Sequence, residues 1–326
     1  MNQPVIVTVE KSTGVLTLDR PKALNSLSPE MIAIITEALD QWRDDDGIQQ
    51  VVIRTEGKHF CSGGDVRWAR DTILAGNHED VDRFMAAEYA MNQKIAEYPK
   101  PYIALMNGVV MGGGLGVSAH GSHRVITADT WASMPEMNIG YITDVGMSHT
   151  FQNLPGHPST ALGKFLAITG YRLTAGDMMA TGLATHQVES FDGLLEAIIE
   201  RGPQAIEEAA IQPDHAELPK IYTDIDEAFV GSWPEITANL SGDLKGMVEE
   251  LTAQASPSMM VAAAELFDAN STKTLAESLD NERALGEVSR REPDFVEGVR
   301  AVLVDKSKDA KFAPQADPSR YREVLS

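Results

Sequence analysis

The spacing of apolar and polar residues predicts alternating strands and helices in the first part of the chain. Residues 4–10 and 14–19 alternate between apolar and polar positions on either side of a short polar turn, which predicts a β-hairpin. Ser28 and Pro29 then precede apolar residues at helical spacing, which predicts an amphipathic helix over 29–43. This order indicates an α/β fold.

Two predicted strands are each followed by a glycine-rich turn. The short apolar run 51–53 precedes a turn containing Gly63 and Gly64, and the apolar run 102–106 precedes the glycines 112–114. A predicted helix over 81–97 connects them, so the strands are expected to be parallel with right-handed crossovers. Ligands of such sheets lie where strands end and helices begin.

Beyond Gly156 the pattern becomes helical and strands nearly disappear. Helical periods cover residues 158–168, 174–180, 256–290 and 293–303. The acidic, alanine-rich stretch 200–217 is expected to form a solvated helical excursion. We therefore expect a core over residues 1–190 and a mainly helical C-terminal region, 191–326, that completes the same fold.

Composition narrows the classes of function. The chain has 326 residues, 43% of them hydrophobic and 23% charged, as in ordinary globular proteins. Its net charge of −21 argues against nucleic-acid partners and anionic membrane surfaces. It contains no apolar run of membrane-spanning length, and residues 1–10 contain no signal or transit pattern. With a single cysteine, Cys61, these features predict a cytoplasmic protein without an internal disulfide.

The glycines after residue 106 predict a site for negative charge. Glycines between a strand and a helix leave backbone N–H groups free and allow close approach to a ligand. Such a site could hold a phosphate or an oxyanion that forms during a reaction. The stretch 114–119 also fits the dinucleotide-binding pattern G-x-G-x-x-A, but about 100 residues of α/β pattern precede it and the required acid is poorly placed.

Two carboxylates follow the second glycine turn. Glu136 stands among apolar residues, so burial is expected to raise its pKa toward the range of acid–base catalysis. Asp144 could cap a helix beginning near Val145, take part in chemistry, or do both.

Other candidate nucleophiles and ligands are weaker. His59 and Cys61 could form a catalytic pair, although Cys61 is more simply a small buried thiol. His120 and His123 have a spacing found in metal sites, but no second pair completes a set. No G-x-S-x-G motif of serine hydrolases occurs.

Three segments resemble signatures of the crotonase, or enoyl-CoA hydratase/isomerase, superfamily. They are LDRPKALN at 18–25, HFCSGGD at 59–65 and NGVVMGGG at 107–114. The resemblance implies a spiral of ββα units that holds an acyl-CoA. It also implies that the backbone N–H groups of Gly64 and Gly113 bind the thioester carbonyl oxygen.

Within this superfamily, three further segments resemble the branch of 3-hydroxyisobutyryl-CoA hydrolases, which act in valine catabolism. They are MPEMNIGYITDVG at 134–146, ITGYRLTAGDMMATGLATHQV at 168–188 and DFVEGVRAVLVDK at 294–306. Hydratases carry two catalytic glutamates, one matching Glu136 and the other matching Gly116. This chain instead has Asp144, as the hydrolases do, although Thr143 stands where they have proline.

The resemblance implies hydrolysis of a short, branched 3-hydroxyacyl-CoA. Glu136 would act as nucleophile or general base, and Asp144 would orient water or the substrate hydroxyl. Glu88 would hold the acyl group, and Lys22 and Arg67 would meet the CoA phosphates. No metal or other cofactor is expected. The alternatives are an enoyl-CoA hydratase or isomerase and a noncatalytic acyl-CoA-binding protein, and a homo-oligomer stays open.

Overall fold

The computed structural model describes residues 3–326, which form two compact units. Unit 1 comprises the chain up to Gly64 and residues 90–132 and 172–217. Unit 2 comprises residues 65–89, 133–171 and 218–326. Each unit is assembled from separate segments, and the proposed boundary at residue 190 stays a prediction.

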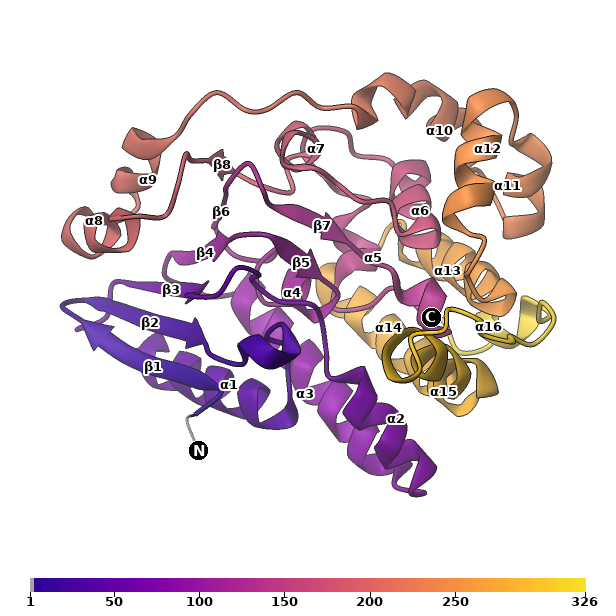
Figure 1. Cartoon of the computed structure of the whole chain (residues 1–326), viewed down its shortest axis with the longest axis horizontal. Helices are drawn as coiled ribbons and strands as arrows, with labels where there is room; N and C mark the ends of the chain where they lie inside the picture. Colours follow the sequence, from indigo (N-terminus) through magenta and orange to yellow (C-terminus); the bar gives the residue numbers. More distant parts are fainter. Residues whose placement is uncertain (1–2) are drawn as a thin grey trace. The chain divides into compact units, whose positions relative to one another are not determined.

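Unit 1 is built on a six-stranded sheet in the order β1-β2-β3-β4-β6-β8 (Figure 1). The first two strands form the expected antiparallel hairpin, and the later strands pair in parallel. Two strands, β6 and β8, were not predicted because they are short and begin with histidine. The bounds are β1 (Val5–Glu10), β2 (Thr13–Leu18), β3 (Gln50–Thr55), β4 (Tyr102–Met106), β6 (His123–Ile126) and β8 (His186–Gln187).

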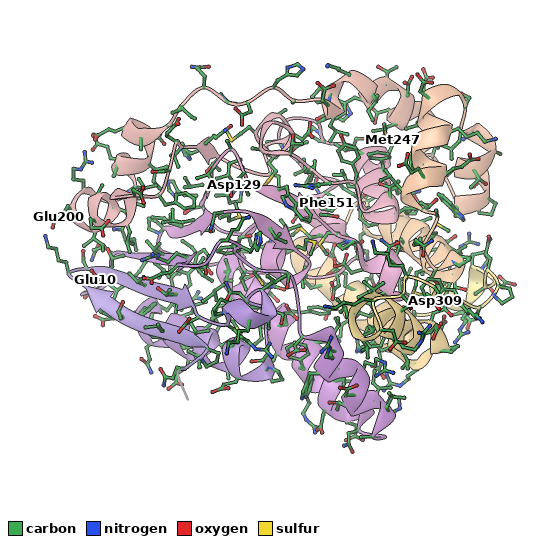
Figure 2. All side chains as sticks on the ribbon, viewed as in Figure 1. Glu10, Asp129, Phe151, Glu200, Met247 and Asp309 are labelled. Atoms are coloured by element: carbon green, nitrogen blue, oxygen red, sulfur yellow. The ribbon has the colours of Figure 1, made fainter. Side chains whose placement is uncertain are left out.

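Helices cover both faces of this sheet. On one face, α1 (Pro29–Arg43) begins where Ser28 accepts a hydrogen bond from the Met31 N–H, as predicted, and Trp42 packs directly on Gly14 of β2. On the other face, α8 (Leu194–Arg201) and α9 (Gln204–Ala209) share a hydrophobic core with alternate residues of the strands. Figure 2 labels Glu200 on α8, where an ion pair with Lys11 ties that helix to the β1–β2 turn.

The acidic stretch 200–217 is helical only over its first part, so the prediction of a helical excursion was wrong for the remainder. α9 ends at Ala209, and Ala210 forms an antiparallel bridge with Val188, just after β8. Asp214 then exchanges hydrogen bonds with the Gln187 side chain. These contacts, together with Pro213, replace the helix by an extended segment paired with the end of the sheet.

Three short elements of unit 1 frame the glycine-rich turns. They are β5 (Val109–Met111), β7 (Trp131–Ser133) and α4 (Gly113–Gly116), and β5 and β7 form a second, two-stranded sheet. The helix that follows the second glycine turn begins at Gly113 itself and lasts about one turn. Unit 1 also contains α7 (Ala175–Thr181), near the range expected for it.

Unit 2 is almost wholly helical. Its central pair is α13 (Pro257–Asn270) and α14 (Leu275–Arg291), the two amphipathic helices expected between 256 and 290. They pack on each other and on α5 (Met147–Thr150), and α13 also packs on α6 (Thr160–Thr169). The other elements are η2 (Glu136–Ile139), η3 (Leu218–Ile221), α10 (Tyr222–Ala228), α11 (Trp233–Asn239), α12 (Gly242–Leu251) and α16 (Ser319–Arg322).

The segment after the first glycine turn forms two helices where one was predicted. α2 (Val66–Leu74) is followed by α3 (His78–Ala96), and Gly76 between them has φ +83°. Residues with positive φ end a right-handed helix, which explains the break. In unit 2, α2 packs against α15 (Pro293–Val299), which continues as a π-helical turn, η4 (Arg300–Val304).

Over residues 3–326, no helix combines the length and the apolar character needed to cross a membrane.

Candidate functional site

The two glycine-rich turns of unit 1 lie side by side. Cys61 forms a parallel bridge with Val110: its N–H donates to the Val109 carbonyl over 3.0 Å, and its carbonyl accepts from the Met111 N–H over 3.0 Å. A methyl group added to Gly63 would lie in van der Waals contact with the second turn, 3.7 Å from the Gly113 nitrogen, and φ +115° at this position favours glycine. Segments about 50 residues apart in the sequence thus present adjacent backbone groups.

Two backbone donors in these turns are unused. The described chain offers no hydrogen-bond acceptor to the N–H groups of Gly64 and Gly113. Gly113 is the first residue of α4, a position whose N–H has no partner inside a helix. The paired turns therefore have the chemistry of an anion or oxyanion site, as the sequence predicted.

Asn25 is the side chain that holds the first glycine turn in place. It is buried, and its amide nitrogen donates to Thr55 Oγ1 and to the carbonyls of His59 and Phe60 over 2.9–3.1 Å. The backbone next to Asn25 also binds this turn, because the Leu27 N–H donates to the Gly63 carbonyl over 2.8 Å. Sequence analysis assigned Asn25 no role, although it ends the first family signature.

The thiol of Cys61 is buried, as the simpler interpretation expected. Cys61 is fully buried and its Sγ lies 3.1 Å from the Asn25 carbonyl oxygen. The sulfur thus supports the same turn that Asn25 anchors, and no bond to His59 is observed among the described residues.

The remaining predicted residues of unit 1 have different environments. Lys22 is exposed in η1 (Pro21–Ala23), where a phosphate could reach it. Gly116 is buried as the last residue of α4. His123 begins β6, and its ring stacks on His186 with centroids 6.0 Å apart. Across residues 3–326, no group of three or more histidine, cysteine or acidic side chains is arranged to hold a metal.

Three of the buried carboxyl groups of unit 2 belong to residues that the sequence singled out. Glu88 of α3, Glu136 at the start of η2 and Asp144 are exposed by only 2%, 7% and 6%. Burial, strengthened by Asp144, raises the pKa of Glu88 to about 8. Burial and then Asp144 also raise the pKa of Glu136 well above its usual value. The expectation that the surroundings of Glu136 would raise its pKa is therefore confirmed.

Asp144 differs from the other two acids because it accepts a strong hydrogen bond. The Tyr89 hydroxyl donates to its Oδ2 over 2.6 Å. Burial raises the pKa of Asp144, but the Tyr89 hydrogen bond and the Arg290 charge oppose that shift and limit it to about 6. By contrast, Glu88 Oε1 and Glu136 Oε2 are buried without a hydrogen-bond partner among the described residues.

The suggestion that Asp144 caps a helix was wrong. The next helix, α5, begins at Met147, and its N-cap is Gly146, which has no side chain that could cap it. Its free N–H groups are satisfied by Glu282 of α14, which accepts from the Gly146 and Ser148 nitrogens over 2.7 and 3.0 Å. Asp144 meets that helix end only through its backbone carbonyl, which accepts from the Met147 N–H over 3.0 Å, while its carboxylate accepts from Tyr89.

The backbone beside Asp144 is strained. Val145 has φ +54°, a left-handed conformation that is rare for a β-branched residue. Strain of this kind persists where surrounding contacts enforce it. Here the hydrogen bonds from the Gly146 and Ser148 nitrogens to Glu282 are such contacts. Thr143, the noted departure from the hydrolase pattern, is fully buried before this turn. Glu282 was not predicted because it lies 138 positions after Asp144 in the sequence.

Arg67 is exposed on α2, and its guanidinium donates to the Leu303 carbonyl at the end of the π-helical turn. Glu88 and Asp144 are thus buried, whereas Arg67 and Lys22 are exposed at the surface. The roles of all these residues stay predictions.

Known proteins similar to this chain fall into one family. The family model described as enoyl-CoA hydratase/isomerase matches residues 13–323. A zebrafish (Danio rerio) protein named 3-hydroxyisobutyryl-CoA hydrolase, mitochondrial, is 37% identical over 92% of this chain and 82% of its own length. The human protein of that name is 34% identical over 96% of this chain and 84% of its own.

Solved structures confirm the crotonase fold over the whole chain. A carnitinyl-CoA dehydratase from Mycobacterium thermoresistibile has a TM-score of 0.91 and 34% identity, covering 100% of this chain and 97% of its own. An enoyl-CoA hydratase from Rhodobacter sphaeroides has a TM-score of 0.88 and 31% identity, with 99% and 97% covered. The resemblance drawn from three short signatures is thus confirmed along the full length, and the chain belongs to the enoyl-CoA hydratase/isomerase family.

Proposed function

We propose that this protein hydrolyses 3-hydroxyisobutyryl-CoA, a short branched 3-hydroxyacyl-CoA, to 3-hydroxyisobutyrate and CoA. The observation that carries the proposal is the name of the relatives that match nearly the whole chain. The residues agree with that name: Gly116 stands where a hydratase needs its second glutamate, and a buried Asp144 is present instead.

The proposed reaction exchanges the thioester bond for a carboxylic acid and a thiol. The N–H groups of Gly64 and Gly113 stabilise the negative charge that develops on the carbonyl oxygen. Glu136 acts on the carbonyl carbon in one of two ways. It attacks directly, giving an anhydride and CoA thiolate, and water then cleaves the anhydride; or it removes a proton from water as the water attacks.

The other predicted residues contribute to binding. Asp144 orients the water or the substrate hydroxyl, and Glu88 holds the acyl group. Lys22 and Arg67 meet the phosphates of CoA, for which their exposed positions leave room. The proposed reaction uses water as its only co-substrate and requires no metal or separate cofactor.

The second candidate function is hydration of an enoyl-CoA, because the two similar solved structures are named as a dehydratase and a hydratase. Addition of water across a double bond uses two acids near the reacting carbons. Gly116 removes the first of these, which favours the hydrolase.

One assay separates these functions. The purified protein is offered 3-hydroxyisobutyryl-CoA, with thiol release followed by a colour reagent, and crotonyl-CoA, with loss of its conjugated absorbance. Thiol release without hydration supports the hydrolase. Hydration without thiol release contradicts it, and tight binding of both thioesters without turnover supports a noncatalytic acyl-CoA-binding protein.

Two further properties of the protein need their own measurements: its cellular location and whether it forms a homo-oligomer. The sequence predicts the cytoplasm, whereas the zebrafish and human relatives are named as mitochondrial. Cell fractionation with an antibody against the protein checks the location, and sedimentation of the purified chain measures whether it forms a homo-oligomer.

A further inference from the structure

A continuous chain of hydrogen bonds leads from Asp144 across unit 2 to a pair of arginines. The Tyr89 hydroxyl donates to Asp144 over 2.6 Å and lies 3.2 Å from the Tyr141 hydroxyl. Tyr141 in turn accepts a hydrogen bond from Arg290 Nη1 over 2.6 Å. Two tyrosines therefore connect a buried carboxylate to a buried guanidinium.

At the far end of this chain of hydrogen bonds, Asp82 pairs with both arginines. Arg290 Nη2 donates to Asp82 over 2.8 Å, and Arg291 donates to the other oxygen of Asp82 over 2.6 Å. The guanidinium of Arg290 is thus held between Asp82 and Tyr141, and it cannot swing toward Asp144. Its positive charge acts on Asp144 through space, and the two hydroxyl groups link the two side chains by hydrogen bonds.

The packing of α14 makes room for this arrangement. A methyl group on Gly286 would lie 2.4 Å from the Tyr141 hydroxyl oxygen and 3.0 Å from Arg290 Nη1. Only glycine at that position allows the hydroxyl to approach α14 closely enough to meet Arg290. Gly286 therefore leaves the space in which Arg290 donates its hydrogen bond to Tyr141.

We propose that Tyr89 and Tyr141, backed by Arg290, are positioning residues that fix the orientation of Asp144 and keep it the ionised member of the three buried carboxyl groups. The structure supplies donors to Asp144 and leaves one buried oxygen of Glu88 and one of Glu136 without any. A hydrogen bond to a carboxylate stabilises its charged form, so among Glu88, Glu136 and Asp144 the negative charge settles on Asp144.

The groups that face Asp144 come from three sides. From α3 come Tyr89 and Glu88, and from η2 comes Glu136, which the charge of Asp144 affects. From α14 come Arg290, which favours the charged form, and Glu282, whose buried carboxyl is itself influenced by Asp144. Of these neighbours only Arg290 is positive. The two tyrosines connect it to Asp144 by hydrogen bonds.

This arrangement bears on catalysis, and that part rests on the proposed function. A fixed negative charge on Asp144 raises the proton affinity of Glu136, which makes Glu136 a stronger base or nucleophile once it has lost its proton. Loss of the tyrosine hydroxyl would leave Asp144 partly protonated at neutral pH. The difference in pKa between Asp144 and Glu136 would then become smaller.

The test measures the carboxyl groups directly and needs no substrate. Protein labelled with carbon-13 at the aspartate and glutamate carboxyl groups is titrated by NMR, with the Asp144 signal identified by its loss in Asp144→Asn. We expect Tyr89→Phe to raise the Asp144 pKa by about one unit or more, because a hydrogen bond to the charged form is lost. We expect Tyr141→Phe and Gly286→Ala to raise it by a smaller amount.

Tyr102→Phe is the matched control, because it also removes a buried hydroxyl, one that donates to the Val117 carbonyl in unit 1. It should leave the Asp144 titration unchanged. An Asp144 pKa in folded Tyr89→Phe and Tyr141→Phe equal to that of the unmodified protein overturns the proposal. If the protein hydrolyses the thioester, the acidic limb of its kcat profile should move with the Asp144 pKa; a protein without that activity contradicts the proposed function and leaves the NMR test intact.

Discussion

The glycine turns of unit 1 and the carboxyl cluster of unit 2 offer chemistry in opposite ways. The turns present backbone N–H groups that a short glycine motif after a strand already indicates, although Asn25 and the bridge between Cys61 and Val110 hold them in place. The cluster presents side chains whose charge depends on residues up to 146 positions away, from Asp144 to Arg290. A backbone site can therefore be recognised from a short motif, whereas the protonation state of buried acids requires the folded surroundings.

The contrast also appears in what each region does with unsatisfied groups. The turns leave two donors, at Gly64 and Gly113, without partners among the described residues. The cluster leaves two acceptors, on Glu88 and Glu136, buried without donors. Unpaired polar groups cost stability, and a bound ligand can recover that cost. Both regions are thus prepared for a ligand at the expense of the free protein.

Glu136→Gln should produce the largest effect and test the cluster. The amide keeps the shape of the side chain but cannot act as base or nucleophile, so we expect kcat for thioester hydrolysis to fall by roughly a thousandfold. Calorimetry should show CoA binding unchanged. Glu196→Gln, an exposed change on α8, is the control and should leave kcat unaltered. Undiminished turnover in Glu136→Gln would remove this residue from the mechanism.

Asn25→Ala tests the glycine turns in the same way. The substitution removes three buried hydrogen bonds and places alanine at φ +54°. We expect the free energy of unfolding to fall by about 2–4 kcal/mol and kcat to fall by about tenfold or more, as the Gly64 N–H loses its position. Denaturant titration and the thiol-release assay measure these effects.

Asn153→Ala is the matched control for that change. Its amide donates to the His149 carbonyl at an exposed position, so stability should change by less than about 0.5 kcal/mol. Equal effects of the two substitutions would show that Asn25 has no special part in holding the turn.

Glu88→Gln should reveal the cost of the cluster as a dependence on pH. With a pKa of about 8 in the folded chain against an ordinary value of 4.5, Glu88 binds a proton that the unfolded chain has released. Stability from this group is therefore complete below pH 4.5 and falls as pH rises toward 8. We expect the amide to raise the unfolding free energy at pH 8 by about 4 kcal/mol and to have no effect near pH 4.

Denaturant titration at several pH values measures this difference. The exposed change Glu196→Gln should be neutral throughout the same range. A Glu88→Gln protein that follows the unmodified protein at every pH would mean that Glu88 is already ionised in the folded state.

Cys61→Ala should give the smallest effect and separates support from chemistry within unit 1. The thiol contacts the Asn25 carbonyl in a fully buried site, so its loss should cost about 1 kcal/mol of stability. Turnover should stay within about threefold of the unmodified protein. Complete loss of activity in a folded Cys61→Ala protein would revive the histidine–cysteine pair as the catalytic group.

Much of the fold followed from local patterns. The hairpin, α1 and its Ser28 cap, the strand from Tyr102 to Met106 and the two C-terminal amphipathic helices were all predicted within a few residues. These elements carry strong periodicity or a clear cap. The short strands β6 and β8 were missed because two to four residues contain too little pattern, and the nine-residue helix α2, which precedes the predicted helix over 81–97, was also missed.

The sequence by itself determined the identity of the candidate chemical groups. Glycine pairs after strands, Glu136 in an apolar stretch and the absence of a glutamate at Gly116 are local facts, and short-range sterics and hydrophobicity give them meaning. Only the tertiary structure decided how the acids share their charge. That outcome depends on burial and on Tyr89, Tyr141 and Arg290, and electrostatic interactions between side chains act through space rather than along the chain.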